Sequence, residues 1–403
     1  MEEGNAGFDY AVLDHGECNF SAAFQLGCFA FCHSQTKKLQ LCILVNRLLP
    51  RMIVLLCLQL AAFLTFAQPA RLQKEAQQLA KEAGESIGTG EFHTAAEKFA
   101  RASKLDPKNV DYQIGLANAR FFLQDHAGAM AICKPLMTGK KPNAEAFQVY
   151  GSCQDALGQS YEALATFREG LIHFPKSGAF YMEMGIVEFG RNRDAEALAY
   201  WESGIQIQPD YAANYYFAAP VLLQMGDYAW SANYAELFIN LSRNAERVTE
   251  MSLLLMEAHE AARHFDYQKA FKWQFFQPKD TAEMHSKEAT RYPQLLDEAY
   301  SSEFTDTTTR ISIAKLADIR RFVAYWLPRQ DPQNPAMNLY RWQQRVVDAG
   351  FWEAYNYWLL ADARPDKAQN WFENNKSEFE EFESWLMKNS IHKHLKRAVV
   401  RPK

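Results

Sequence analysis

Small residues recur along the middle of the chain at a fixed interval of 34 positions. Alanine occupies positions 95, 129, 163 and 197, and a second series keeps the same interval at Ala83, Ala117, Gly151, Gly185 and Ala219. A bulky aromatic residue follows the alanine in three of the repeats, at Phe99, Phe167 and Trp201. A proline follows eight residues after each aromatic, at Pro107, Pro175 and Pro209. A period of this length is typical of helical hairpins stacked in a row.

The residue types fit such hairpins. Two helices approach closely only where both present a hydrogen or a methyl group, so Gly or Ala is needed at the crossing points, with an aromatic ring beside them. Proline ends the second helix, because it lacks the amide proton and clashes with the preceding turn. We therefore predict five hairpins over residues 76–245, beginning at residues 76, 110, 144, 178 and 212.

Short turns fall between the paired helices, among them Gly90-Glu91-Phe92 and Gly226-Asp227-Tyr228. Together with the 34-residue series, these turns resemble the tetratricopeptide repeat (TPR) family, which usually carries a Gly-Asp-Tyr-like tripeptide at this place. The resemblance covers about half of the chain. It implies an all-α fold, a TPR-type solenoid of helical hairpins, and it says little about function.

The second and fifth repeats depart from the family pattern. In the second, Cys133 stands where an aromatic residue is expected, and Pro135 lies inside the second helix. In the fifth, Ser231 takes the alanine position and Arg243 replaces the closing proline. We interpret residues 246–279 as one further degenerate repeat.

Residues 280–403 lose the repeat register and predict a smaller, aromatic-rich helical domain. The expected helices cover residues 310–327, ending before Pro328, then 338–360 and 365–388. The last of them presents a broad aromatic face, and two interpretations of it stay open. The face packs as a helical cap on the solenoid, or it is a platform for a carbohydrate or a partner. Its residues are Trp371, Phe372, Phe379, Phe382, Trp385 and Leu386.

The beginning of the chain carries a targeting pattern. Arg47 and Arg51 precede an uncharged run over residues 53–66, and the small residue Ala67 follows it. A basic region, an apolar region and a small-residue cleavage site in this order are typical of a signal peptide. We expect a signal peptide over residues 52–67 with cleavage after Ala67, and a periplasmic or secreted bacterial protein. The run is shorter than the roughly 20 residues of a spanning helix, and membrane anchoring by residues 52–67 is the alternative. We interpret residues 1–51 as a mis-called or disordered N-terminal extension.

Charge and reactive residues narrow the function. The net charge of −5 argues against a nucleic-acid ligand, which needs a basic face. His259 and His264 stand five residues apart, whereas a metalloprotease helix needs its histidines four apart, so we expect surface histidines. Cys133 and Cys153 are the only cysteines after residue 67, and the sequence leaves open whether they are two buried thiols or form a disulfide. We find no motif for catalysis, a metal or a cofactor, and we expect a non-enzyme.

In TPR-like arrays, ligands usually lie in the groove formed by the first helix of each hairpin. Counted from the repeat starts, the positions that face this groove are polar at one end: Asp111, Ile114, Asn118, Phe121, Glu145, Gln148, Ser152 and Asp155. They are apolar at the other end: Met182, Ile186, Phe189, Tyr216, Pro220 and Leu223. As the binding residues we predict Asn118, Phe121, Gln148, Met182, Ile186, Phe189, Tyr216 and Leu223.

These positions suit a peptide or protein segment held by a few aromatic and aliphatic anchors. The alternative is that the C-terminal region of the chain itself covers the apolar end. The carboxylate clamp of co-chaperone arrays is absent, although Asn118 matches one of its asparagines. We therefore expect an interaction scaffold of the cell envelope. The second hypothesis is an envelope glycan-associated protein that binds polymer through the Trp-rich C-terminal helices.

Overall fold

The computed structural model describes residues 70–265, 271–276, 287–303, 311–395 and 398–401. The predicted signal peptide and N-terminal extension therefore lie outside the described residues. The chain divides into two units, residues 1–77 and 78–403. Of the first unit the structure describes residues 70–77, which are helical. The following paragraphs concern the second unit.

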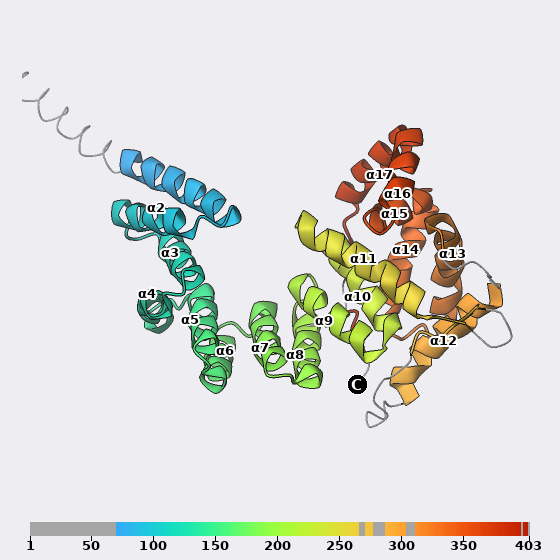
Figure 1. The fold of residues 1–403 in the computed structure, drawn as a ribbon, viewed down its shortest axis with the longest axis horizontal. Helices are drawn as coiled ribbons and strands as arrows, with labels where there is room; N and C mark the ends of the chain where they lie inside the picture. Colours follow the sequence, from blue (N-terminus) through green and yellow to red (C-terminus); the bar gives the residue numbers. More distant parts are fainter. Residues whose placement is uncertain (1–69, 266–270, 277–286, 304–310, 396–397, 402–403) are drawn as a thin grey trace, which may run out of the picture. The chain divides into compact units, whose positions relative to one another are not determined.

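Residues 78–88 are helical and precede a series of antiparallel helices that, from α2 onward, each pack on the next (Figure 1). The helices of this series are α2 (Phe92–Leu105), α3 (Val110–Phe122), α4 (His126–Thr138), α5 (Ala144–Ala156), α6 (Ser160–His173), α7 (Gly178–Gly190), α8 (Asp194–Ile207) and α9 (Ala213–Met225). The first helices of neighbouring hairpins, α3, α5, α7 and α9, also contact one another. The predicted helical solenoid is confirmed.

Local sequence starts and separates these helices. Asn109, Asp125 and Asn143 are N-cap residues whose side chains accept a hydrogen bond from a first-turn amide of α3, α4 and α5. Such caps are typically worth about 1 kcal/mol each. Gly90 and Gly158 adopt φ of 77° and 78° between paired helices, a conformation that glycine reaches without strain.

Glycines and rings alternate where the helices of a hairpin cross. A Cβ on Gly185 would come within 2.1 Å of the Trp201 indole, and one on Gly151 within 2.3 Å of the Phe167 ring. The small residue and the bulky one therefore form a single packing unit, which explains why both recur in the sequence with the same period.

Helix α10 completes the fifth hairpin with α9, and the helices that follow gather around it (Figure 1). The elements of this region are α10 (Tyr228–Leu241), α11 (Ala245–Ala261), β1 (Arg263–Phe265), β2 (Phe271–Trp273), α12 (Lys287–Glu303), α13 (Ile313–Gln330), α14 (Met337–Asp348), α15 (Trp352–Leu359), α16 (Pro365–Asn374), α17 (Lys376–Lys388) and the 3₁₀ helix η1 (Ile391–Lys393). The strands β1 and β2 pair antiparallel, with His264 opposite Lys272.

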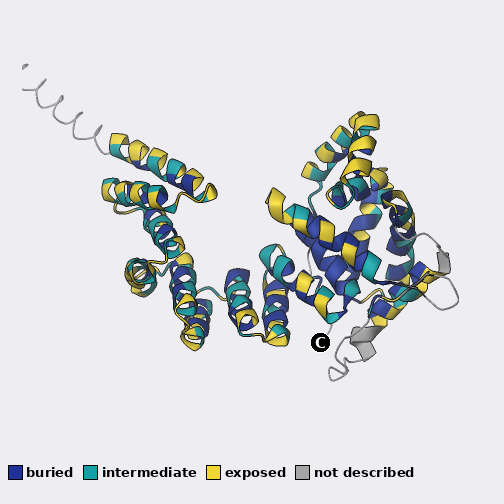
Figure 2. Cartoon of the chain, in the orientation of Figure 1, coloured by how far each residue is buried: buried dark blue, intermediate teal, exposed yellow. Residues whose placement is uncertain are grey.

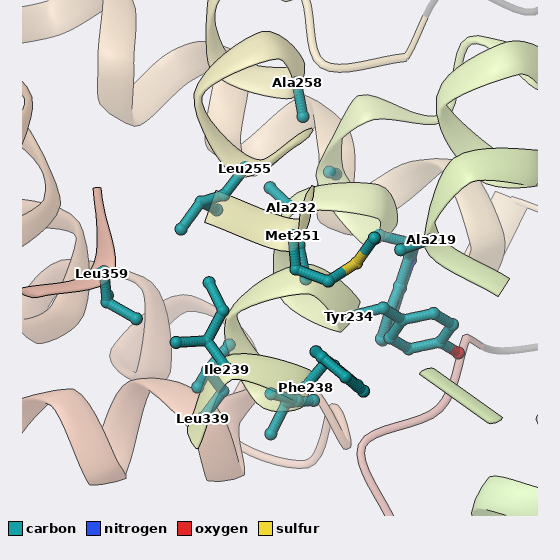
Figure 3. Close-up of a cluster of buried hydrophobic side chains, with 14 of the residues drawn as sticks. Ala219, Ala232, Tyr234, Phe238, Ile239, Met251, Leu255, Ala258, Leu339 and Leu359 are labelled. Carbon is teal, nitrogen blue, oxygen red and sulfur yellow. The ribbon is translucent and has the colours of Figure 1, made fainter. Parts of the chain in front are cut away.

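Helix α10 is buried from Ala229 to Leu241 and forms the centre of this region (Figure 2). In Figure 3 its Phe238 and Ile239 lie in one cluster with Leu255 of α11 and Leu339 of α14. Because neighbouring helices surround α10, it has no face exposed to solvent between Ala229 and Leu241. A two-helix repeat would leave one side of it open, so the C-terminal helices complete the core of the fifth hairpin.

A charged pair lies inside this core. The guanidinium of Arg320 on α13 donates to the carboxylate of Glu236 on α10, and both side chains are buried. Glu236 also accepts from Tyr355 Oη at 2.7 Å and from Gln343 Nε2 at 2.9 Å. Four helices, α10, α13, α14 and α15, thus share one polar cluster.

Several C-terminal helix boundaries differ from the prediction. Helix α13 continues through Pro328 to Gln330 instead of ending before the proline. The reason lies on the neighbouring helix α14: Pro328 cannot donate to the Ala324 carbonyl four residues earlier, and Gln344 Nε2 donates to that oxygen at 2.8 Å instead. The helix predicted over residues 338–360 breaks at Gly350, which has φ of 84°, and the one over 365–388 breaks at Asn375.

The described part of the predicted degenerate repeat, residues 246–279, consists of α11 followed by the β1–β2 hairpin. One expectation for this segment needs correction. His259 is buried rather than on the surface. Its polar ring is accommodated there because its two ring nitrogens form hydrogen bonds with the Leu255 carbonyl at 2.8 Å and the Tyr300 hydroxyl at 3.2 Å. Among the described residues, no helix combines the length and apolar character needed to cross a membrane.

Candidate functional site

Two open pockets lie along the first helices of the hairpins. The acidic pocket, of 470 Å³, lies between α3, α5 and α7 and is lined by Asn118, Phe121, Phe122, Glu145, Gln148, Val149, Ser152, Asp155, Ala156, Phe167, Glu183, Ile186 and Val187. The apolar pocket, of 460 Å³, lies between α7, α8, α9 and α11 and is lined by Ile186, Phe189, Trp201, Tyr216, Phe217, Pro220, Val221, Glu250, Met251, Leu253, Leu254 and Glu257. Ile186 lines both pockets, so they form one groove.

Three carboxylates face the acidic pocket. Glu183 extends from α7 toward α5, where Ser152 Oγ donates to its Oε2 at 3.3 Å. Asp155 accepts from Ser160 Oγ at 2.6 Å, and Glu145 is exposed. No Lys or Arg of the described residues forms an ion pair with Glu145, Asp155 or Glu183. Glu145, Asp155 and the ionised form of Glu183 therefore carry negative charge that no ion pair in this part of the chain balances.

Glu183 is half-buried, and this position changes its acidity. Burial, with a smaller contribution from the charge of Asp155, raises the pKa of this carboxyl to about 7, while the hydrogen bond from Ser152 opposes the shift. A cation placed in the pocket would favour the ionised carboxylate, because an opposite charge at contact distance lowers the pKa of an acid.

Aromatic rings form one wall of the acidic pocket. Phe122 stacks on Phe92 of the preceding hairpin with ring centroids 4.8 Å apart, and Phe121 meets Phe122 edge-on at 5.7 Å. Phe122 nevertheless keeps 49% of its surface exposed. This wall is fixed by ring packing and still offers apolar area to a ligand.

The apolar pocket has a rigid aromatic floor and exposed anchors at its edge. Trp201 stacks on Phe217 at 5.7 Å, and its indole Nε1 donates to the Met182 carbonyl at 3.1 Å. Phe189 and Leu253 remain 46% and 49% exposed. An apolar ligand side chain can contact both of them.

Helix α11 closes one side of the apolar pocket. The Tyr216 hydroxyl of α9 donates to the Glu250 carboxylate, and the Arg247 guanidinium lies 4.7 Å from the centre of the Tyr216 ring. Among the described residues, the lining ends at Glu257 and includes nothing from α12 to α17. The C-terminal helices thus contribute no wall to the pocket, contrary to the alternative in which they cover this end of the groove.

The predicted groove residues fall in three groups. Those that line the acidic pocket are Asn118, Phe121, Gln148 and Ile186, and those that line the apolar pocket are Ile186, Phe189 and Tyr216. Met182 and Leu223 line neither pocket: both are partly buried, and the Met182 sulfur accepts from the Tyr211 hydroxyl. Ile114 is buried in the core of its hairpin rather than in the groove.

Sequence reasoning missed two contributors to the groove. Glu183 lies one position beyond Met182. The sequence did indicate it, because Glu183 is the one charged residue in the otherwise apolar segment from Ala179 to Val187. The second contributor is α11, which forms one side of the apolar pocket, and the 34-residue repeat could have predicted it. Adding 34 to positions 216, 220 and 223 gives Glu250, Leu254 and Glu257, all three of which line the apolar pocket.

A second polar cavity lies beside the Glu236–Arg320 pair. It measures only 20 Å³ and is lined in part by His259, Tyr300 and Tyr340. Burial and the nearby Arg320 charge lower the pKa of His259 to about 3, so its imidazole is neutral at physiological pH. A space of this size holds at most one water molecule, and we assign the cluster to the core.

The cysteines and metal candidates add no reactive centre within the described residues. Cys133 and Cys153 are free and buried, and burial raises the pKa of their thiols to about 12 and about 11. Such thiols stay protonated and unreactive. No group of three or more His, Cys, Asp or Glu side chains in this part of the chain is placed to hold a metal ion.

One family model matches part of the helical repeats. Residues 87–135 match the family model described as Tetratricopeptide repeat. No curated protein matches the chain. The chain is similar to the TPR protein TTC0263 of Thermus thermophilus, with 16% identity, a TM-score of 0.39, and coverage of 45% of this chain and 98% of that one. It is also similar to PilF of Pseudomonas aeruginosa, with 17% identity, a TM-score of 0.35, and coverage of 47% and 86%.

Proposed function

We propose that this chain, a tetratricopeptide repeat protein, is a non-catalytic interaction scaffold that binds a peptide segment of a protein partner in the groove of its first helices. The observation that carries the proposal is the pair of open pockets, 470 and 460 Å³, that meet at Ile186. Together they extend from α3 to α11, which suits a chain segment better than a small molecule.

The surfaces of the groove support a segment with defined anchor residues. Exposed Phe189 and Leu253 lie above a floor of Trp201 and Phe217, so an apolar side chain entering there is removed from water on several sides. Binding energy in such interfaces is concentrated in a few buried apolar anchors. We infer that the apolar pocket provides most of the affinity.

The C-terminal helices pack around α10, and their aromatic rings do not offer a second binding surface. None of the tryptophans whose side chains the structure describes is exposed, and rings of the proposed aromatic face pack on one another, as Phe372 does on Phe379 at 4.5 Å. A carbohydrate platform needs an exposed ring face. The packed aromatic rings therefore favour the helical-cap interpretation, and we do not advance the glycan-binding alternative.

We also propose that the protein acts in the cell envelope. The support is the basic, apolar and small-residue order that ends at Ala67. Sequencing the N-terminus of the protein isolated from its source cells tests this, with Gln68 as the expected first residue. Recovery of a peptide from residues 1–38 would contradict both the cleavage and the interpretation of residues 1–51.

Photocrosslinking tests the groove directly. The photoreactive amino acid p-benzoylphenylalanine replaces Phe189 in the groove or, as a control, Tyr161, which is 71% exposed and lines neither pocket. We expect a defined protein adduct from position 189 in cells and none from position 161. Adding Ile186→Glu should abolish the adduct, because a charge then lies where the two pockets meet. Equal adducts from both positions would refute groove binding.

A further inference from the structure

Resting on the proposed function, we infer that the acidic pocket selects a Lys or Arg side chain of the bound segment, next to an apolar residue that occupies the apolar pocket. The ligand class is thus a peptide with a basic residue beside an aliphatic or aromatic one. Three features of the pocket carry the inference: its size, its uncompensated charge and its aromatic wall.

The space suits a long side chain. The acidic pocket measures 470 Å³ and is open to solvent, so a Lys or Arg can enter from a segment lying along the groove. Long basic side chains bury their methylene groups on apolar surface and keep the charged end near polar groups. Phe121, Ile186 and Val187 provide that apolar surface, and α5 and α7 contribute the carboxylates of Glu145, Asp155 and Glu183.

The charge of the pocket is not neutralised from within. Glu183 receives one hydrogen bond, from Ser152, and its second carboxylate oxygen has no protein partner among the described residues. Asp155 lies close enough for its charge to raise the pKa of Glu183, so the two carboxylates repel each other. An arriving ammonium or guanidinium group removes this repulsion and supplies the missing donors.

The aromatic wall adds a second preference for a cation. Phe122 stacks on Phe92 and keeps 49% of its surface exposed in the pocket wall. A guanidinium or ammonium group over a phenyl face gains cation–π attraction. The same wall and carboxylates repel an acidic side chain or a terminal carboxylate, which excludes the ligand that a carboxylate clamp binds.

The neighbouring apolar pocket sets the sequence context of the basic residue. Because Ile186 lines both pockets, a side chain in one is followed along the segment by a side chain in the other. Glu250 and Glu257 also line the apolar pocket, and the Tyr216 hydroxyl donates to Glu250. All other lining residues are apolar or aromatic, so an uncharged apolar side chain is the anchor that fits there.

Selection from a random dodecapeptide display library, with the full-length chain as the target, tests the inference. Parallel selections use Glu183→Gln, Ile186→Glu and, as the matched control, Glu169→Gln, an exposed carboxylate on α6 outside both pockets. Wild type and Glu169→Gln should enrich Lys or Arg beside an apolar residue. Glu183→Gln should keep the apolar enrichment and lose the basic one, and Ile186→Glu should enrich nothing.

A double-mutant cycle on one selected dodecapeptide, labelled with fluorescein, then isolates the contact. Fluorescence anisotropy should show Kd at least tenfold higher for Glu183→Gln, which equals about 1.4 kcal/mol. Replacing the basic peptide residue by Met should cost a similar factor in wild type and little in Glu183→Gln. Glu145→Gln, at an exposed position of the same pocket, repeats the test should the Glu183 variant fail to fold.

The outcomes separate the two proposals. Enriched peptides without a basic residue, or equal losses in Glu183→Gln and Glu169→Gln, would overturn the cation pocket and leave groove binding intact. Additive losses in the cycle would overturn the contact between Glu183 and the basic residue. A selection that enriches nothing on wild type would overturn the inference together with the proposed function.

Discussion

Single glycines decide how closely the helices of a hairpin approach. Gly185 of α7 lies against the Trp201 indole of α8, which is itself held by a hydrogen bond from its Nε1 to the Met182 carbonyl. The ring cannot retreat, because it also stacks on Phe217 of α9. The packing of α7, α8 and α9 therefore depends on a glycine, without a Cβ methyl group, at position 185.

Gly185→Ala should destabilise the protein by about 1–3 kcal/mol, since an added methyl group overpacks a filled core. Gly190→Ala, in the last position of the same helix, is the control: a Cβ there meets nothing within 4 Å. It should be neutral or slightly stabilising. Urea unfolding followed by tryptophan fluorescence measures both, and equal midpoints for the two variants would contradict this account of the repeat.

The N-cap of α10 is a second residue whose surroundings determine its effect. Asp227 is buried, accepts from the Trp230 amide at 3.3 Å, and lies 3.6 Å from Arg401 near the end of the chain. Burial raises its pKa from the ordinary 3.8 to about 7, against the opposing charge of Arg401. The carboxyl therefore holds its proton more tightly in the folded than in the unfolded state.

Asp227→Asn should change how stability depends on pH. Because the folded pKa is the higher one, the contribution of Asp227 is present below pH 4 and is lost as the pH rises toward about 7. The stability of wild type relative to the Asn variant should thus fall across this window. Asn keeps the N-cap hydrogen bond. Unfolding free energies at several pH values test this, and parallel curves would refute it.

At the scale of elements, α13 shows how a distant side chain repairs an internal proline. Pro328 leaves the Ala324 carbonyl without its helical donor, and Gln344 of α14 supplies one at 2.8 Å. The sequence alone predicts an end of the helix before Pro328, since nothing near the proline indicates a substitute donor. The residue that lets the helix continue lies on another helix.

Gln344→Ala should cost about 1–3 kcal/mol, because it leaves a largely buried carbonyl oxygen without a donor. Pro328→Ala restores the helical amide, so in that background the Gln344→Ala cost should shrink to a few tenths of a kcal/mol. The four unfolding free energies of this cycle are the measurement. An undiminished cost in the Pro328→Ala background would show that Gln344 acts through other contacts.

The elements differ in how far sequence could predict them. The hairpins from α3 to α9 follow from residues in contact within one period, such as Gly151 and Phe167, so the local pattern is sufficient. The same period, extended by one unit, would have found Leu254 in the groove wall. It could not have found the partners of Glu236, because Arg320 lies 84 positions away and follows no repeat.

At the scale of the whole described unit, stability is distributed unevenly. Each hairpin from α2 to α9 contacts mainly its neighbours, as in a one-dimensional repeat array. Around α10, by contrast, four helices share the Glu236–Arg320 cluster, and residues 398–401 attach there too, with the Arg401 amide donating to Tyr234 Oη at 3.2 Å. We expect this region to open as one cooperative unit and the early hairpins to open separately.

Arg320→Met tests this division. Removing one partner of a buried ion pair typically costs about 3–5 kcal/mol, because the remaining charge stays buried and unpaired. Native-state hydrogen exchange should therefore show faster exchange throughout α10, α13, α14 and α15 in the variant, and unchanged exchange in α3 to α6. Arg168→Met, at an exposed position of α6, is the control and should leave all of these rates unchanged. If Arg320→Met accelerated exchange equally in α3 and α13, the described unit would open as a whole, and the early hairpins would not be independent of the core around α10.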